Sequence, residues 1–352
     1  YFAYLRERGY PEDVCTPDGI QRTDVPPEGA GRHLPCHFPA RYHAEDSEAA
    51  FQTTHALEHL QSVQGRPWFF SLNYVKPHPP HICAAPYHAM HNPADMPPAL
   101  RRADELDDPH PYLGAMKSRR AMLSDAQIAE IRACYYGMIT ELDVQLGRLF
   151  QALKDSGQWD NTLIIFTSDH GEYLGDHYFL DKAPLYDATM RVPLIIRGPS
   201  PEANATRGQP LDCFSESIDI VPTMLEYAGL PAPDRLQGLS LLGAIRGLEP
   251  GCPKREAHFE YDFRDKTKSR KEINPDECLL WVLRDDDYKF VQFGVESFPA
   301  MLFDMRRDPG EWENLAQRPE CAGIVADYAQ RMLRWRMKNE DQRMEHWAYP
   351  MR

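Results

Sequence analysis

The longest regular pattern of apolar positions along the chain predicts one long helix. Apolar side chains recur every three or four residues between positions 128 and 153, which is the spacing of one helix face. Ser124 stands where an N-terminal cap belongs, and Gly157 stands where a helix ends. The expected buried face consists of Ile128, Ile131, Tyr135, Ile139, Leu142, Leu146, Leu149 and Leu153.

Three short apolar runs predict buried strands. Residues 161–167 and 192–196 are almost continuously apolar, which is typical of strands covered on both faces of a sheet. Residues 68–75 form an aromatic-rich run that ends in a proline-rich turn. A further helix is expected around residues 217–228. The order strand, helix, strand, loop, strand, helix predicts an α/β fold.

The pattern changes after residue 252 and predicts a small C-terminal subdomain. Residues 279–283 and 288–293 are expected to pair as a hairpin, and residues 322–338 to form a terminal helix. The spacing of its apolar residues places Leu333 and Trp335 on the buried side of that helix.

Composition and charge describe an ordinary folded protein with an acidic surface. Of 352 residues, 39 are Lys or Arg and 53 are Asp or Glu, which gives a net charge of −14. This sign disfavours nucleic acids and anionic membranes as partners. No apolar run approaches the roughly 18 to 20 residues that cross a bilayer. The eight cysteines are scattered without a Cys-x-x-Cys pair, so free thiols are expected rather than disulfides or structural zinc.

The most informative stretch follows the predicted strand at residues 161–167. There Asp169, His170 and Gly171 come directly after the apolar run, at the edge of the sheet where α/β proteins bind ligands. A neighbouring carboxylate and imidazole can ligate one cation, and Gly171 permits the turn that this requires. Taken alone, these three residues fit equally well a structural turn that the aspartate caps.

Several blocks of sequence, in the right order, resemble the sulfatase family of the alkaline phosphatase superfamily. The blocks around the Asp-His pair are 167–172 (TSDHGE), 174–177 (LGDH), Lys182 and 191–196 (RVPLII). The others are 76–80 (KPHPP), 85–88 (APYH), 92–95 (NPAD), 136–139 (YGMI) before Asp143, 216–223 (ESIDIVPT), 302–304 (LFD) and 308–315 (DPGEWENL). Among family members, the KPHPP block and the His after the metal-binding Asp are most similar to phosphonate monoester hydrolases.

The resemblance implies a fold and its division into domains. It implies an alkaline-phosphatase-like α/β/α sandwich in residues 1–255, with its N-terminal portion missing. It also implies a smaller α+β subdomain in residues 256–352, built from a small antiparallel sheet and a terminal helix.

The resemblance also implies a set of site residues. Asp169 and His170 would ligate one divalent metal ion, calcium or manganese. Lys182 would contact the transferred sulfuryl or phosphoryl group, and His78 would act near the leaving group. Such cationic groups suit a tetrahedral anionic ester, because they neutralise charge as its bond breaks. We expect all four residues at one pocket. Lys76 and His177 fit a role in the site or mere support of its loops equally well.

The family's nucleophile motif is missing from the chain. Sulfatases carry a Cys-x-Pro-x-Arg or Ser-x-Pro-x-Arg motif whose first residue becomes formylglycine. Cys15 is followed by a matching proline but by Gly19 where arginine belongs, and Cys36 stands one residue too far from its proline. The resemblance therefore implies that the nucleophile lies upstream of Tyr1, and that this chain is inactive by itself.

The expected function is hydrolysis of sulfate esters or of phosphonate and phosphate esters, with a small anionic ester as the substrate. One alternative is a phosphodiesterase or phosphomutase-like enzyme of the same superfamily with a Ser or Thr nucleophile. Another is a non-catalytic binding protein on the same scaffold. A cytoplasmic location is expected. The sequence leaves a homo-oligomer open.

Overall fold

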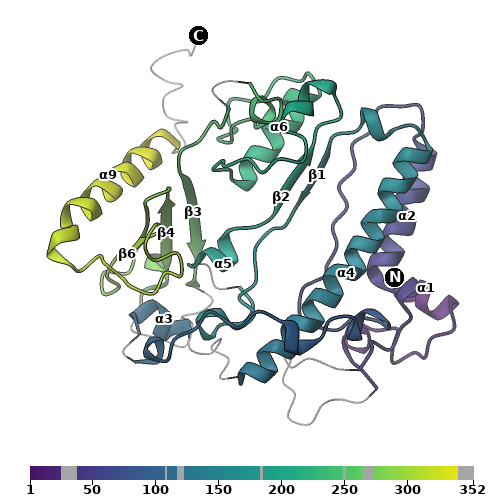
Figure 1. Ribbon diagram of the computed structural model, residues 1–352, viewed down its shortest axis with the longest axis horizontal. Coiled ribbons are helices and arrows are strands. Elements are labelled where there is room, and N and C mark those ends of the chain that lie inside the picture. The colour runs from purple at the N-terminus through teal and green to yellow at the C-terminus, as the bar shows by residue number, and fades with distance from the viewer. Residues whose placement is uncertain are drawn as a thin grey trace. The chain divides into compact units, whose positions relative to one another are not determined.

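The computed structural model describes residues 1–24, 38–107, 109–116, 123–182, 185–248, 251–264 and 273–339 (Figure 1). Its helices are α1 (Phe2–Glu7), α2 (Glu48–Ser62), α3 (Pro111–Ala115), α4 (Asp125–Asp155), α5 (Asp187–Met190), α6 (Ile220–Tyr227), α7 (Leu242–Ile245) and α9 (Ala322–Asn339). Its strands are β1 (Ile164–Thr167), β2 (Leu194–Arg197), β3 (Ala257–Asp262), β4 (Leu279–Arg284), β5 (Tyr288–Phe293) and β6 (Met301–Asp304).

The chain divides into two compact units. Unit one comprises Tyr1–Arg102, Arg119–Thr162 and Glu172–Lys182, and unit two comprises Ala103–Ser118, Leu163–Gly171 and Ala183–Arg352. The boundary between domains that the sequence suggests near residue 255 stays a prediction.

Unit one is built on the predicted long helix, which is confirmed as α4. Ser124 accepts a hydrogen bond from the Gln127 N–H, and the Gln127 side chain accepts one from the Ser124 N–H, so a capping box starts the helix. Helix α2 packs along α4, as Figure 1 shows. The predicted buried face is only partly correct, because Ile139 is exposed whereas Glu141 is fully buried. A buried partner for that carboxylate explains the difference, as described below.

The predicted strand at residues 68–75 is wrong. This segment has no regular secondary structure and pairs with no strand among the described residues. Three of its aromatic side chains, Trp68, Phe70 and Tyr74, instead contact residues on or next to helices, whereas Phe69 is exposed. Trp68 Nε1 donates a hydrogen bond to the Gln158 side chain at 2.8 Å, just beyond α4. The hydroxyls of Tyr74 and Thr53, the latter on α2, lie 2.7 Å apart. Polar atoms on these rings find their partners on α2 and just beyond the end of α4 rather than in a sheet.

Unit two contains the other two predicted strands, which pair with each other. Strands β1 and β2 are antiparallel, with Ile165 opposite Ile196. One face of β2 packs on a cluster that includes Leu241 and Ile245. Ile195 on the other face is 63% exposed, so the expectation of burial on both faces is wrong for β2. The helix expected around residues 217–228 is confirmed as a 3₁₀ turn followed by α6.

The C-terminal part of unit two is an antiparallel sheet in the order β3-β4-β5-β6, against which α9 packs (Figure 1). The predicted hairpin is confirmed as β4 and β5, and the predicted terminal helix as α9. Trp335 meets the Trp281 ring edge-on at 5.3 Å between ring centroids. Leu333 is 57% exposed, so its predicted burial is wrong. Tyr328 and Met332 occupy the buried side of α9 instead.

One disulfide contradicts the expectation of free thiols. Cys213 and Cys252 are bridged across 39 residues of sequence. Phe214 and Lys254 form an isolated antiparallel bridge beside them, which brings the two segments together. Spacing in the sequence cannot reveal a pairing that depends on this long-range contact. The free cysteines among the described residues, all buried, are Cys15, Cys83, Cys134, Cys278 and Cys321.

The described helices include none that combines the length and apolar character needed to cross a membrane.

An ion-pair network between the C-terminal sheet and α9 predicts a dependence of stability on acid pH. Hydrogen bonding from His258, opposed by burial and reinforced by Arg331, lowers the pKa of Glu256 to about 2. Because the folded-state pKa is depressed, the stabilisation is present above the usual glutamate pKa and is lost as pH falls toward about 2. Glu256→Gln should therefore flatten the acid limb of a plot of urea midpoint against pH. Glu260→Gln, an exposed change on β3, is the control, and equal acid limbs in the two variants would contradict the prediction.

Candidate active site

The Asp169–His170 pair lies just beyond the end of β1, as the sequence predicts. Asp169 Oδ1 accepts a hydrogen bond from the His170 N–H at 3.0 Å, and the Ser168 hydroxyl lies 3.4 Å from the same oxygen. The other oxygen, Oδ2, lies 3.4 Å from His170 Nε2. The Asp169 side chain is 82% exposed. The turn therefore places one carboxylate oxygen and one imidazole nitrogen next to each other at the surface of unit two.

The hydrogen bonding of His170 suits a metal ligand. Its Nδ1 lies 2.8 Å from the carbonyl oxygen of Gly171. A carbonyl can only accept, so Nδ1 carries the proton and Nε2 presents a lone pair in the neutral ring. Histidines that ligate metals commonly donate their second N–H in this way. A carboxylate oxygen beside such a nitrogen is a donor set that fits a divalent cation.

Gly171 is required by the close approach of α5. Its N–H donates a hydrogen bond to the Thr189 carbonyl at 2.9 Å. A Cβ added at this position would lie 2.1 Å from the Ala188 carbonyl oxygen. No side chain fits against that backbone, so the residue after His170 must be glycine for α5 to support the turn.

Lys182 ends a closed loop in unit one. One oxygen of Glu172 accepts hydrogen bonds from the Asp181 N–H at 2.6 Å and the Leu174 N–H at 3.3 Å. The Tyr173 N–H also donates to the Asp181 carbonyl. Burial raises the pKa of Glu172 to about 7 despite these bonds. The loop is thus closed between Glu172, which follows Gly171, and Asp181, which precedes Lys182.

Arg132 of α4 anchors the same loop. Its guanidinium lies 2.6 Å from Asp176 Oδ1 and donates to the Leu174 carbonyl at 3.0 Å. It also donates to the carbonyls of Pro97 and Pro98. Arg132 is buried, and it satisfies four acceptors with its planar fork of donors. The sequence singled out Asp176 as part of a motif but gave no sign of this partner.

His78 lies in unit one on a turn between prolines. Its N–H donates to the Val75 carbonyl at 3.0 Å, and its side-chain Nδ1 lies 2.7 Å from the Pro79 carbonyl. By the same argument as for His170, Nδ1 is the protonated nitrogen. The ring of His78 is therefore oriented by its own turn.

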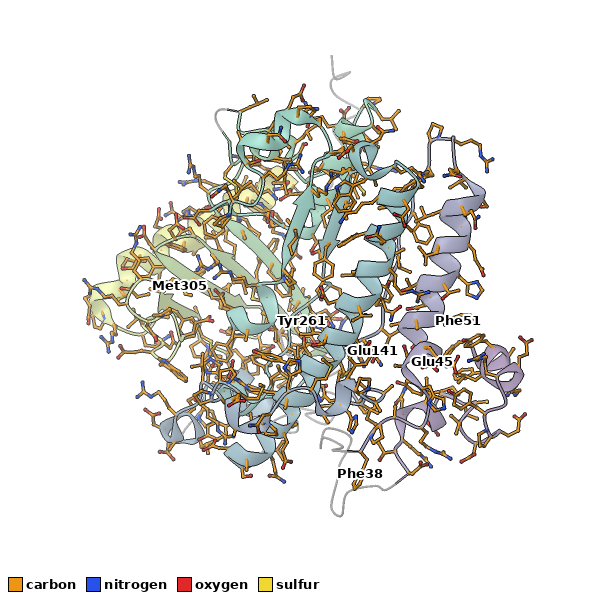
Figure 2. All side chains as sticks on the ribbon, turned by 45° about the vertical axis from the view of Figure 1, so that its right-hand side comes forward. Phe38, Glu45, Phe51, Glu141, Tyr261 and Met305 are labelled. Atoms are coloured by element: carbon orange, nitrogen blue, oxygen red, sulfur yellow. A yellow bond between two sulfur atoms is a disulfide. The ribbon has the colours of Figure 1, made fainter. Side chains whose placement is uncertain are left out.

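A buried ion pair that the sequence did not predict connects this turn to α4. Lys76 Nζ lies 2.5 Å from Glu141 Oε2, and Glu141 sits on α4 (Figure 2). Burial alone would lower the pKa of Lys76, but Tyr42 and Glu141 act in the opposite direction and hold it above its usual range. A usable signal existed in the sequence, because Glu141 continues the helical spacing of the buried residues Cys134 and Met138.

The structure therefore brings Asp169 and His170 together, and it places His78 and Lys182 in the other compact unit. Among the described residues, no group of three or more His, Cys, Asp and Glu side chains gathers into a metal site. Convergence of the four residues on one pocket stays a prediction.

The fold and these motifs resemble those of the sulfatases, and comparison with known proteins identifies the family. A family model described as sulfatase matches residues 17–230. A second, described as N-sulphoglucosamine sulphohydrolase, C-terminal, matches residues 175–338. The chain belongs to the sulfatase family of the alkaline phosphatase superfamily, and the resemblance stated from the sequence is confirmed. Members of this family generally use a divalent metal.

Two curated relatives are similar over much of the chain. The multifunctional alkaline phosphatase superfamily protein PehA of Trinickia caryophylli is 38% identical over 99% of this chain and 70% of its own. An arylsulfatase of Clostridium perfringens is 30% identical over 76% of this chain and 53% of its own. The chain therefore spans only part of the length of these relatives.

A solved structure confirms the predicted fold class. The phosphonate monoester hydrolase of Silicibacter pomeroyi matches with a TM-score of 0.86 and 34% identity, over 96% of this chain and 68% of that one. The fold is the mixed helix and sheet arrangement of the alkaline phosphatase superfamily, and these relatives are ester hydrolases.

Proposed function

We propose that the protein hydrolyses sulfate esters or phosphonate and phosphate esters, and that Asp169, His170, Lys182 and His78 carry the reaction. The observation that carries this proposal is the geometry of the turn after β1. There the Asp169 carboxylate and His170 Nε2 lie 3.4 Å apart, and hydrogen bonds fix both groups. Membership of the sulfatase family supports the reaction class.

In the proposed site, Asp169 and His170 hold a divalent metal ion, calcium or manganese. When bound, the ion would neutralise charge on the ester and act as a Lewis acid. The chain's own contribution is to present a carboxylate oxygen and an imidazole nitrogen side by side. The hydrogen bond from His170 Nδ1 to the Gly171 carbonyl keeps the ring proton away from Nε2, the nitrogen that would face the metal.

Lys182 and His78 would act on the transferred group and the leaving group. The Lys182 ammonium would neutralise negative charge that develops on the sulfuryl or phosphoryl oxygens. As a general acid, His78 would carry a second proton on Nε2 and give it to the departing oxygen, since its Nδ1–H is engaged with the Pro79 carbonyl. This hydrogen bond also fixes the ring plane, so the donated proton has a defined direction.

We place the nucleophile, a formylglycine, upstream of Tyr1. Cys15 does not suit this role, because it is buried and its thiol lies 3.6 Å from the Tyr10 carbonyl within unit one. Cys36 lies outside the described residues.

The proposed substrate range is broad. A site made of one divalent cation, a lysine and a histidine stabilises any tetrahedral anionic ester of similar size. His170 and the 76–80 block are similar to phosphonate monoester hydrolases, and one relative bears the name multifunctional. We therefore expect hydrolysis of aryl phosphonate monoesters, phosphodiesters and sulfate monoesters.

The test is an assay of the protein, as its gene encodes it, against all three ester classes. Turnover of at least two classes, abolished in Asp169→Ala, is the expected result. Hydrolysis of a single sugar sulfate, without phosphonate or diester turnover, would contradict the broad range and indicate a dedicated sulfatase. Absence of any turnover with all three classes would contradict the proposed reaction.

A cytoplasmic location stays a prediction from the sequence. The disulfide between Cys213 and Cys252 is more typical of proteins in oxidising compartments.

A further inference from the structure

A buried ion cluster in unit two consists of Lys289, Asp187 and Glu311. Lys289 points from β5 into the core and has no solvent exposure. Its Nζ lies 2.8 Å from Asp187 Oδ1 and 2.6 Å from Glu311 Oε1. The three residues are up to 124 positions apart in the sequence, so only the fold brings them together.

Close contacts join cations and carboxylates in this cluster, although burial still raises the pKa of Glu311. Arg284 adds a second cation, 3.5 Å from the other oxygen of Asp187. Burial alone would raise the pKa of Asp187, but Lys289 and then Arg284 outweigh it, and the pKa lies below its usual range. Burial of a lysine and two carboxylates costs desolvation energy that their attraction roughly offsets. A role in fixing geometry therefore explains the cluster better than a contribution to stability does.

The cluster holds the first residue of α5 by both its side chain and its backbone. While Asp187 Oδ1 contacts Lys289, the Asp187 N–H donates a hydrogen bond to Glu311 Oε2 at 2.7 Å. The short helix α5 begins at this residue. Its N-terminus is thereby tied to β5 through Lys289 and to the loop after β6 through Glu311.

Helix α5 in turn touches the Asp169–His170 turn through its backbone. The Thr189 carbonyl, two residues after Asp187, accepts the Gly171 N–H at 2.9 Å. The Ala188 carbonyl lies so close to Gly171 that no Cβ fits between them. The Gly171 carbonyl is the acceptor that orients the His170 ring. A continuous chain of contacts therefore leads from Lys289 to His170.

From this chain of contacts we infer that the cluster of Lys289, Asp187 and Glu311 positions the Asp169–His170 turn. Lys289 is a positioning residue, because it acts on the turn through α5. The functional part of this inference rests on the proposed role of Asp169 and His170 in metal binding, whereas its structural part does not. The inference gives the C-terminal sheet a role in building the active site.

The direct test is hydrogen exchange of the Gly171 amide, measured by mass spectrometry with single-residue fragmentation. Lys289→Met removes the cation at similar volume, and we expect exchange at Gly171 to become at least about tenfold faster through local opening. Arg331→Met is the matched control, because Arg331 also bridges two carboxylates, Asp285 and Glu256, neither of which belongs to the cluster. The control should leave Gly171 exchange unchanged.

A second variant covers the case in which Lys289→Met fails to fold. Lys289→Met combined with Glu311→Gln removes one charge of each sign and leaves Arg284 beside Asp187. Faster exchange at Gly171 in either variant, relative to Arg331→Met, supports the inference. Equal exchange at Gly171 in these variants and the control would overturn it.

Metal affinity and kcat/KM, measured beside Gly171 exchange, separate a failure of this inference from a failure of the proposed function. The expected result is faster Gly171 exchange together with a fall of about 10- to 100-fold in metal affinity, the range for residues that orient metal ligands. Faster exchange with unchanged metal affinity and kcat/KM would support the positioning of the turn and contradict its role in the active site. Unchanged exchange would overturn the inference whatever the activity.

Discussion

Replacing Lys182 with alanine is expected to lower kcat at least about 100-fold, the usual loss when one charge contact to the transition state is removed. The reason is electrostatic. A sulfuryl or phosphoryl group gains negative charge on its oxygens as the ester bond breaks, and an ammonium fixed beside them stabilises that state more than the bound substrate. Glu172 accepts a hydrogen bond from the N–H of Asp181, the residue before Lys182, so the backbone that carries the lysine is held in place.

The measurement is steady-state kinetics of the protein as its gene encodes it, with an aryl phosphonate and an aryl sulfate. Lys154→Ala, a loss of the same charge at the end of α4, is the control and should leave kcat unchanged. If Lys182→Ala raised KM while kcat stayed constant, the lysine would bind substrate without acting in the transition state. An unchanged kcat/KM would remove Lys182 from the mechanism.

Elements with a strong local signal could be predicted from the sequence. The helix from Asp125 to Asp155 has regular spacing, a cap and a stop, and these features depend only on neighbouring residues. The β4–β5 hairpin is defined in the same way by two apolar runs around a polar turn. The run at residues 68–75 carries an equally good strand signal, but three of its aromatic rings contact residues on or next to helices instead. Local pattern cannot show which surface a half-buried segment will meet.

The candidate site likewise contains features that local sequence could predict and features that depend on long-range contacts. The placement of Asp169 and His170 beside each other just after β1 could be predicted, because they are adjacent and follow a clear strand, whereas their role in the site stays a prediction. Glu141 lies 65 residues from Lys76, and its role depends on how α4 packs against the turn that carries His78. The buried cluster around Lys289 depends on contacts across still longer separations. The helical spacing marks Glu141 as a buried position, but no pattern in one sequence names the partner of a buried charge, so the pairing became visible only in the structure.

Glu141→Gln is expected to destabilise the protein by about 3–5 kcal/mol, because it leaves the Lys76 ammonium buried without a counter-charge. Glu58→Gln on α2 is the matched control. Glu58 and its partner His55 are both well exposed, and exposed pairs contribute at most about 1 kcal/mol. Both free energies of unfolding are measured by urea denaturation at neutral pH.

A double variant decides whether charge pairing is the cause. If it is, Lys76→Met combined with Glu141→Met should recover most of the lost stability, since well-packed apolar residues replace buried ion pairs at little cost. The turn that carries His78 would then rest on an apolar contact, and kcat would report whether the ion pair also orients His78. A loss below about 1 kcal/mol in Glu141→Gln would mean that water reaches Lys76 or that its proton is released. The buried pair would then not be the support beneath His78.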